Sequence, residues 1–599
     1  MNPEQSVTPT TFESFNARNL SPLQVAKTFI PPKQFEDLIL RRHSIVIGPR
    51  GSGKTTLLKM LQPLALAAWK HTDAERLCQR IDFTGVFVAT DVSWGAQLDA
   101  MGTNKLPKDV REQLGRAAFC THVLISFIDT IRHCVQIGGA GPSSLSRIAV
   151  ELSKEQEAQF VEMIAGNWEL QPEIPSLLGI ILALRGRLSD IAKIAQREAN
   201  SDTDTVLNLV RNTSFLHLAL NESLVFGIEA FGAITNDEHR KWAFLFDELE
   251  IAPRYIRRTL FRGLRSTDQR LLYKLSISPY SEDIELLEGS ASAMSMHDYQ
   301  KIELWYPRKE EAIDFCNELL SSMLQEEHLS NSTATDVLGL SEFDPDDSDY
   351  APHGKSSNRF LSLCERDGSF RAYLDKQNVD VNNMHNLSDN KRASAIRKVT
   401  SIVAIREAFK GKSRKNPDIY AGARSIFAIV EGNPRWFIGL TTPLIREFRN
   451  TGKVVDRAIQ SRAISSASNR FRAQLKTIPY KTGGVTHPKG LLGLLDPVGE
   501  AFHRMVVDDP FDPEPALSFV VDASTQEEVI EALGRALNWG AIIYIPRAED
   551  DPILTSLKGK RFRLSYMLAP HYKIPLLIGK EMSLKKILSG ASQPDFFST

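Results

Sequence analysis

Eight consecutive residues near the start of the chain match a phosphate-binding loop in composition and order. Residues 48–55 read GPRGSGKT and fit the pattern GxxxxGK[ST], after a β-branched run and ahead of a helical pattern. Glycines let the backbone wrap closely around phosphates, while successive N–H groups and a helix N-terminus point at the anion. The residues predicted to bind a nucleotide are Gly48, Pro49, Arg50, Gly51, Ser52, Gly53, Lys54, Thr55, Thr56 and Asp247.

Two carboxylates follow an apolar run much later in the chain. The sequence WAFLF (residues 242–246) ends in Asp247 and Glu248, as in a Walker B strand. We predict that Thr55 and Asp247 hold Mg²⁺, that Lys54 reaches the β and γ oxygens, and that Glu248 polarises the attacking water. A structural alternative is that both acids cap the following helix. Beside a phosphate-binding loop, the catalytic interpretation is favoured.

An arginine in an unusual position completes the predicted catalytic set of Glu248, Lys54 and Arg435. The turn-forming sequence GNP (residues 432–434) predicts a helix start, which places Arg435 in the first turn. A positive charge opposes the helix dipole there, so a facing anion such as the γ-phosphate would explain it. The alternative is a surface arginine lying over Trp436.

Further polar residues are weaker candidates for the same chemistry. Ser276 and Ser278 end the next predicted strand and could sense the γ-phosphate, or could be ordinary strand-end serines. The helix after Asp247 carries four arginines, which could form a solvated face or supply an arginine finger to a neighbouring subunit. These are Arg257, Arg258, Arg262 and Arg265, of which the last two are the better candidates.

The elements that would position these residues alternate between apolar strands and helices. Strands are predicted at residues 44–48, 85–90, 242–246, 271–278 and 301–305. This alternation indicates an α/β fold with a parallel sheet covered on both faces. Between the second and third strands lies a long helix-rich stretch, with helical patterns around residues 111–135, 155–164, 174–197 and 206–226.

The 599 residues are too many for one core, so we expect several domains. An N-terminal segment (1–40) would precede an ATPase core (41–310) with a helical insertion at about 92–235. Residues 311–395 would hold a helix and an acidic, partly mobile insertion, centred on 324–360. A helical region (396–480) and a C-terminal α+β domain (490–599) would follow. The order helix (525–538), strand (541–545), strand (561–568) suggests a winged helix.

The C-terminal domain mixes basic and aromatic residues, which would suit contact with a DNA backbone. A solvated strand face is the alternative. The residues are Lys558, Lys560, Arg561, Arg563, Tyr566, His571, Tyr572, Lys573, Lys580, Lys585 and Lys586. The whole chain, with 72 basic and 73 acidic residues, offers no general electrostatic attraction to nucleic acid.

Composition also bears on location. The five cysteines lack metal-ligand spacing, and we expect reduced thiols. The N-terminus lacks the basic and apolar regions of a signal peptide, and the most apolar stretch, near residues 177–184, is too short to cross a membrane. We therefore expect a cytoplasmic protein with no membrane partner.

Five segments together carry a family resemblance: NARNLSP (16–22), FIPP (29–32), GPRGSGKTT (48–56), FLFDELE (244–250) and GNPRW (432–436). With them the chain resembles bacterial AAA+ ATPases of the origin-recognition-complex-like group, which are related to the STAND ATPases. The resemblance implies that the segment before the P-loop, near Phe29 to Phe35, lies by the adenine. It also implies that Arg435 is the sensor-2 residue of a helical lid. The stretch between Asp91 and Lys241 is longer than is usual in that family.

We therefore expect an ATP-driven switch with ATP and Mg²⁺ as cofactors, regulating a larger complex. The resemblance suggests bacterial antiphage defence as the setting. One alternative is a DNA-binding ATPase, a loader or scanner that uses the C-terminal domain. Another is a nucleotide-licensed scaffold or sensor. The expected partners are ATP or ADP, further copies of the chain or an effector protein, with DNA possible.

Overall fold

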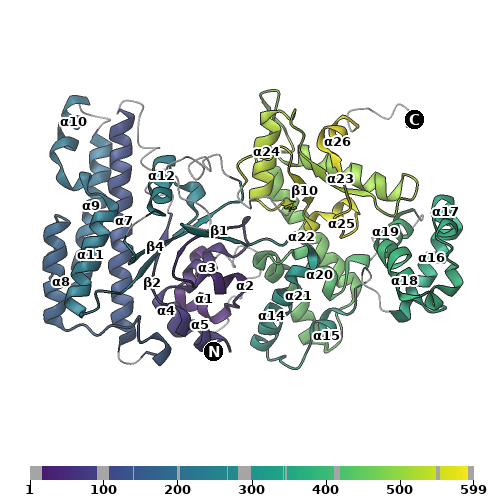
Figure 1. Cartoon of the computed structure of the whole chain (residues 1–599), viewed down its shortest axis with the longest axis horizontal. Coiled ribbons are helices and arrows are strands. Elements are labelled where there is room, and N and C mark those ends of the chain that lie inside the picture. The colour runs from purple at the N-terminus through teal and green to yellow at the C-terminus, as the bar shows by residue number, and fades with distance from the viewer. Residues whose placement is uncertain are drawn as a thin grey trace, which may run out of the picture. The chain divides into compact units, whose positions relative to one another are not determined.

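The computed structural model describes residues 17–90, 107–138, 141–197, 203–265, 268–280, 298–341, 343, 347–410, 418–547 and 554–590. These residues form two compact units (Figure 1). The first, here called the sheet unit, comprises residues 17–48 and 53–304. The second, the C-terminal unit, comprises residues 49–52 together with everything described from Trp305 onward.

The sheet unit is built on five parallel strands in the order β2-β3-β4-β1-β5. The strands are β1 (His43–Ile47), β2 (Thr84–Ala89), β3 (Trp242–Asp247), β4 (Leu271–Ile277) and β5 (Tyr299–Glu303). The predicted parallel α/β sheet is confirmed. β4 lies between β1 and β3, so its carboxyl end adjoins both the loop that follows β1 and the acids that end β3.

Helices cover both faces of the sheet. On one face, Phe119 and Phe127 of α7 (Lys108–Ile137) pack against Phe246 and Trp242 of β3. On the other face, Gly85 of β2 lies under the end of α3 (Lys54–Met60), where a Cβ would come within 2.3 Å of the Leu61 carbonyl oxygen. The central strands β3 and β4 are therefore buried on both sides, which explains why their sequences are mainly apolar.

The predicted helical stretch between β2 and β3 is present, although its start, residues 91–106, lies outside the described residues. α7, α8, α9 and α11 lie side by side (Figure 1). The helices after α7 are η4 (Ser143–Leu145), α8 (Lys154–Asn167), α9 (Leu177–Arg197), α10 (Thr203–Asn212), η5 (Ser214–His217) and α11 (Leu220–Thr235). Because α7 packs directly on β3, this stretch is part of the core of the sheet unit.

In the described part of the chain, one helix, α7, is long and apolar enough to cross a membrane. The sequence interpretation, which considered only the stretch near residues 177–184, missed it. Of its most apolar window, 72% is buried inside the protein. Its phenylalanines face the sheet, so the hydropathy of α7 is that of a core helix.

The remaining helices of the sheet unit lie outside the stretch between β2 and β3 in the sequence. Ser21 and Gln24 form a reciprocal capping box at the start of α1. The elements are η2 (Ala17–Asn19), α1 (Pro22–Thr28), α2 (Lys33–Leu38), α4 (Pro63–Ala68), α5 (Ala74–Arg80), η6 (Leu249–Ile251) and α12 (Arg254–Gly263). Of the predicted N-terminal segment, residues 1–16 lie outside the described residues.

The C-terminal unit begins with a run of helices. They are η8 (Lys309–Ala312), α14 (Ile313–Glu326), α15 (Ala334–Leu338), η9 (Asp347–Tyr350), α16 (Lys355–Arg366), α17 (Gly368–Lys376), η10 (Val381–Asn386), α18 (Asp389–Ala395), η11 (Arg397–Val399), α19 (Thr400–Lys410), η12 (Asp418–Tyr420), α20 (Ala423–Val430), α21 (Pro434–Thr451) and α22 (Arg457–Thr477). The helices α19 to α22 lie within the helical region that the sequence predicts at residues 396–480.

The acidic stretch at 324–360, for which the sequence predicts a mobile excursion, is packed where the structure describes it. Val337 and Leu338 of α15 are buried. The Tyr350 hydroxyl, also buried, lies 2.8 Å from the Thr400 Oγ1 of α19. A few apolar residues among the acids are therefore enough to anchor this stretch. The predicted domain boundaries themselves stay predictions.

The chain ends in an α+β region whose helix and strands match the predicted order. Its elements are the hairpin β6 (Lys481–Thr482) and β7 (Val485–Thr486), then α23 (Leu492–Val507), β8 (Ala516–Val520), α24 (Glu527–Asn538), β9 (Ile542–Tyr544), β10 (Arg561–Leu564), η13 (Tyr566–Leu568), α25 (Ala569–Tyr572), β11 (Lys580–Ser583) and α26 (Leu584–Gly590). A four-stranded sheet runs β11-β8-β10-β9, with β11 parallel to β8. β8 and β11 lie outside the predicted order, and the winged-helix assignment stays a prediction.

Candidate functional site

The loop after β1 has the backbone that a phosphate cradle requires. Gly51 and Gly53 adopt φ values of 85° and 95°, the left-handed region that favours glycine. Gly53 is the N-cap of α3, which begins at Lys54 and carries Thr55 and Thr56 in its first turn. The N–H groups at the start of α3 therefore point out of the helix into the loop, as anion binding requires.

Lys54 and Thr55 are held by hydrogen bonds within the sheet unit. The buried Lys54 Nζ donates to the Gly48 carbonyl oxygen at 2.5 Å. The Thr55 Oγ1 donates to Asp247 Oδ2 at 2.6 Å. The structure thus brings together two predicted elements that are separated by almost two hundred residues.

Ser276 of β4 completes this cluster. Its hydroxyl donates to Asp247 Oδ1 at 2.7 Å and accepts a bond of 3.1 Å from the Glu248 N–H. Asp247 is only 3% exposed, and burial raises the pKa of its carboxyl, while the bonds from Thr55 and Ser276 act in the opposite direction. Ser276 therefore orients the carboxylate and fixes the backbone that follows it.

Glu248 adopts a left-handed backbone conformation, with φ 52° and ψ 42°. A glutamate in this region is strained by about 1–3 kcal/mol, and such strain concentrates at functional positions. It turns the chain sharply at the end of β3. Glu248 occupies the N-cap position of η6 without a side-chain cap bond, and the N-cap of α12 is Pro253, so neither helix start supports the capping alternative.

The loop tip, residues 49–52, makes its contacts in the C-terminal unit. The Asn433 Nδ2 donates to the Arg50 carbonyl oxygen at 3.1 Å. The Asn433 Oδ1 caps α21 by accepting from the N–H groups of Arg435 and Trp436. A Cβ on Gly51 would lie 3.3 Å from the Cβ of Arg435. The predicted helix start is confirmed, and Arg435 lies beside the loop tip.

Asn433 was not singled out by sequence reasoning, which used it only as a turn residue. The signal was available: asparagine before proline at a helix start is a strong N-cap pattern. Its second bond, to the Arg50 carbonyl oxygen of the loop tip, could not be predicted from the residues around Asn433.

Other predicted residues lie outside this cluster. The Ser278 hydroxyl donates to Glu250 Oε1 at 3.1 Å, whereas the Ser276 hydroxyl donates to Asp247. On and after α12, the side chains of Arg258 and Arg262 are exposed, and the exposed Arg265 pairs with Asp298. Their role as arginine fingers stays a prediction.

The predicted basic and aromatic face of the C-terminal domain is wrong in three of its members. Arg563 is 1% exposed and is bonded to the buried Glu431. Tyr566 and Tyr572 are also buried. The physical reason is that Glu431 supplies a counter-charge inside the unit, so the alternating pattern of β10 does not mark a solvent-facing strand.

The aromatic residues expected near an adenine form a core cluster. The ring centroids of Phe29 and Phe35 lie 5.0 Å apart, and both approach Trp69 within 6 Å. All three side chains are buried. They therefore hold α1, α2 and α4 together, and their relation to a base stays a prediction.

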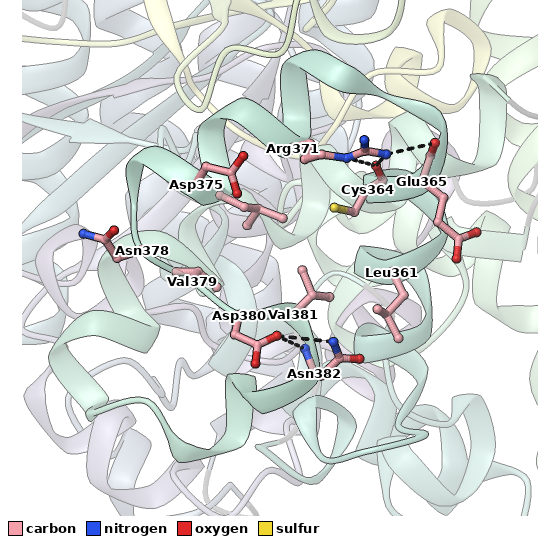
Figure 2. A pocket seen from close by; sticks show the side chains of 11 residues that line it. Leu361, Cys364, Glu365, Arg371, Asp375, Asn378, Val379, Asp380, Val381 and Asn382 are labelled. Carbon is pink, nitrogen blue, oxygen red and sulfur yellow. Dashed lines mark hydrogen bonds between the residues drawn. The ribbon is translucent and has the colours of Figure 1, made fainter.

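A pocket of about 630 Å³ lies away from these residues, among α16, α17 and η10 (Figure 2). Arg371 donates there to the Cys364 and Glu365 carbonyl oxygens at the end of α16, and Asp380 binds Asn382. The Arg371 guanidinium and the Asp380 carboxylate therefore form hydrogen bonds with nearby backbone groups. None of the lining residues belongs to the predicted nucleotide site.

The donor set at Thr55 and Asp247 fits magnesium. A hydroxyl and a carboxylate oxygen are hard ligands, and Mg²⁺ is usually held by one or two carboxylates together with substrate phosphates. The described residues contain no cluster of three histidine, cysteine or acidic residues suited to a dedicated metal centre. All five cysteines are free thiols.

The parallel sheet, the glycine loop after β1 and the carboxylate that ends β3 define a P-loop nucleotide-binding protein. A family model described as ORC-CDC6-like matches residues 10–584. The chain belongs to the ORC-CDC6-like family, which places it among AAA+ ATPases. No curated protein and no solved structure matches the chain.

Proposed function

We propose that this protein binds and hydrolyses ATP with Mg²⁺ and uses the cycle as a switch. The observation that carries the proposal is the bond between Thr55 and Asp247, with Ser276 on the second carboxylate oxygen. A glycine loop without a nearby carboxylate could bind a phosphate group but would offer no carboxylate ligand for its metal ion. A buried carboxylate beside the helix hydroxyl adds the hard oxygen ligands that a magnesium-bound triphosphate needs.

The chain's own residues divide the work. Lys54 would exchange its carbonyl partner for β and γ oxygens, and Thr55 and Asp247 would hold Mg²⁺, which would neutralise charge on the phosphates. Glu248, aimed by its left-handed backbone, orients and polarises the attacking water. Arg435, beside the loop tip, senses the γ-phosphate.

The switch follows from loss of that contact. When the γ-phosphate leaves, Arg435 loses its anionic partner, and the arrangement that ATP favoured is no longer stabilised. We propose that this controls assembly with further copies or with an effector protein in the cytoplasm. We extend the proposal to a role in bacterial antiphage defence, on the strength of the family resemblance of the sequence motifs alone.

Calorimetry with ATP, ADP and Mg²⁺ tests the proposal. The unaltered protein should bind ATP, and Lys54→Ala should not. Glu248→Gln should retain ATP affinity while its steady-state hydrolysis falls by about 10²-fold or more. Absence of ATP and ADP binding to folded protein would refute the proposal, and unchanged turnover in Glu248→Gln would refute the role of Glu248.

A second candidate, a nucleotide-licensed scaffold, is favoured by exposed apolar residues on the helical stretch. Leu178 and Leu182 lie one turn apart on α9 and are 46% and 50% exposed, with Ile174 just ahead of the helix at 52%. Aligned apolar residues of this kind indicate an interaction surface more often than isolated ones do. Mass measurement with and without ATP tests this function. A mass that is independent of ATP and unaltered by Leu178→Glu would exclude ATP-licensed self-assembly.

A further inference from the structure

The carboxyl end of α24 meets the tip of the phosphate-binding loop, within the C-terminal unit. The Arg50 N–H donates to the Asn538 carbonyl oxygen at 2.8 Å. The Arg50 guanidinium lies 4.3 Å from the centre of the Trp539 ring. Two different interactions, one from the backbone and one from the side chain, therefore join the same loop residue to the same helix end.

This arrangement suits the chemistry of a helix terminus. The last carbonyl groups of a helix have no partner within it, and that end carries partial negative charge. Arg50 satisfies one such carbonyl and brings a cation to that end of the helix. Gly540, with φ 71°, turns the chain immediately afterwards; a Cβ there would lie 3.4 Å from that of Pro49.

The helix that makes these contacts is held firmly. Its apolar face, which includes Ile530, Leu533 and Leu537, is buried. At its first turn, the Glu528 carboxylate accepts both N–H groups of the glycine turn between β6 and β7, at 2.7 and 2.8 Å. Its carboxyl end is therefore a fixed point rather than a fraying terminus.

Arg50 is also held from its other side, because its carbonyl oxygen accepts the bond from Asn433. The cradle can bind phosphate well only if its N–H groups are already oriented before the anion arrives. Bonds on both sides of Arg50 restrict the loop tip in this way. Residues 48 and 53–55 are positioned by the sheet unit, so the tip is the part that needs such support.

We propose that Asn538 and Trp539 are positioning residues for the phosphate-binding loop, so that the C-terminal α+β region contributes to nucleotide affinity. This inference rests on the proposed ATP-binding function. Because Arg50 is exposed and Trp539 half-buried, their pair contributes on the scale of an exposed cation–π contact.

A double-mutant cycle on ATP affinity tests the proposal. Arg50→Ala and Trp539→Ala should each raise the Kd for ATP by about fivefold, equivalent to roughly 1 kcal/mol. The double variant should also be about fivefold weaker, because either change alone removes the shared contact. Trp539→Phe, which keeps an aromatic face, should bind ATP within about twofold of the unaltered protein.

Arg116→Ala is the matched control, since it removes another exposed arginine from an aromatic ring, that of Tyr255, at 5.6 Å. Its ATP affinity should be unchanged. Multiplicative losses in the double variant, or singles that lower melting temperature but leave the Kd unchanged, would overturn the inference while leaving the proposed function intact. Failure of the unaltered protein to bind ATP would overturn both.

Discussion

Thr55 Oγ1 and Asp247 Oδ2 are joined by a hydrogen bond of 2.6 Å. The bond connects the first turn of α3 with the last residue of β3, so it unites the two motifs that the sequence shows separately. Both atoms are magnesium ligands by type. The orientation of the Asp247 carboxylate in this pair also depends on Ser276, which donates to its other oxygen.

Replacing Ser276 with alanine should weaken magnesium-dependent activity. The change removes a 2.7 Å bond to Asp247 and the acceptor for the Glu248 N–H. Loss of a residue that orients a metal ligand typically lowers metal affinity by about 10–100-fold. Hydrolysis should therefore require correspondingly more Mg²⁺, measured by titrating Mg²⁺ at saturating ATP. Ser278→Ala, which removes only the bond to Glu250, should behave as the unaltered protein does. An identical response of the two variants would contradict the assignment.

A methyl group on Gly51 should impair nucleotide binding. Gly51→Ala would place a Cβ 3.0 Å from the Asn433 Oδ1, at a φ of 85° that costs an alanine about 1–2 kcal/mol. The loop tip must then shift, so we expect a tenfold or greater rise in the Kd for ATP, on the order of that strain energy. Gly559→Ala is the control, since φ is also positive there, at 75°, but no atom lies within 4 Å. If Gly559→Ala weakened ATP binding equally, strain at the loop tip would not be the cause.

Breaking the buried pair of Arg563 and Glu431 should destabilise the C-terminal unit. Arg563→Met leaves the Glu431 carboxylate buried with only the Ser565 hydroxyl and the Tyr566 N–H. Removing one partner of a buried pair costs about 3–5 kcal/mol. Thermal or denaturant unfolding should show this loss. Arg449→Ala, which breaks an exposed pair with Glu327, should cost less than about 1 kcal/mol. Equal losses would mean that burial is not decisive.

Acidification should destabilise the sheet unit through His43. Burial and the neighbouring Lys274 lower the pKa of His43 to about 4, while Asp298 acts in the opposite direction. The neutral ring is needed because His43 Nδ1 accepts the Tyr273 N–H at 2.9 Å. Between the unfolded value of about 6.5 and the folded value, the unfolded chain binds more protons. Stability should thus fall as pH drops from about 6.5 to about 4, by up to about 3 kcal/mol.

The free energy of unfolding, measured across this range, should be less dependent on pH in His43→Asn. Asparagine can keep an acceptor near the Nδ1 position without titrating. An unchanged slope in this variant would assign the acid sensitivity to other groups.

The sequence predicted the fold of the sheet unit well because its strands carry strong local signals. β3 is an apolar run up to Asp247, and β4 is mainly apolar and is followed by Ser278 and Pro279, as expected for strands buried on both faces. The glycine loop and the acids of β3 could be assigned for the same reason. The residue types of the glycine loop and of the two acids, together with the strand before each, are enough to predict a phosphate site and a metal site.

Contacts between distant segments could not be predicted where no motif marks both partners. Arg563 alternates with apolar residues in β10, as a solvent-facing residue would, and only the three-dimensional position of Glu431 makes its burial possible. Likewise, no local pattern relates Arg50 to Asn538 or Trp539. In the described part of the acidic stretch at 324–360, buried residues such as Tyr350 could not be recognised from average composition.

The position of β4 limits how the catalytic apparatus can move. Its backbone is hydrogen-bonded to β1 on one edge and to β3 on the other. Near its carboxyl end, the Ser276 hydroxyl donates to the Asp247 carboxylate. The loop after β1 and the acids at the end of β3 are therefore connected through β4, which pairs with both strands. Separating β1 from β3 would break the backbone hydrogen bonds that β4 makes with both strands. For the proposed nucleotide site, we therefore expect exchange to involve motion of the loop tip while β1, β4 and β3 stay paired.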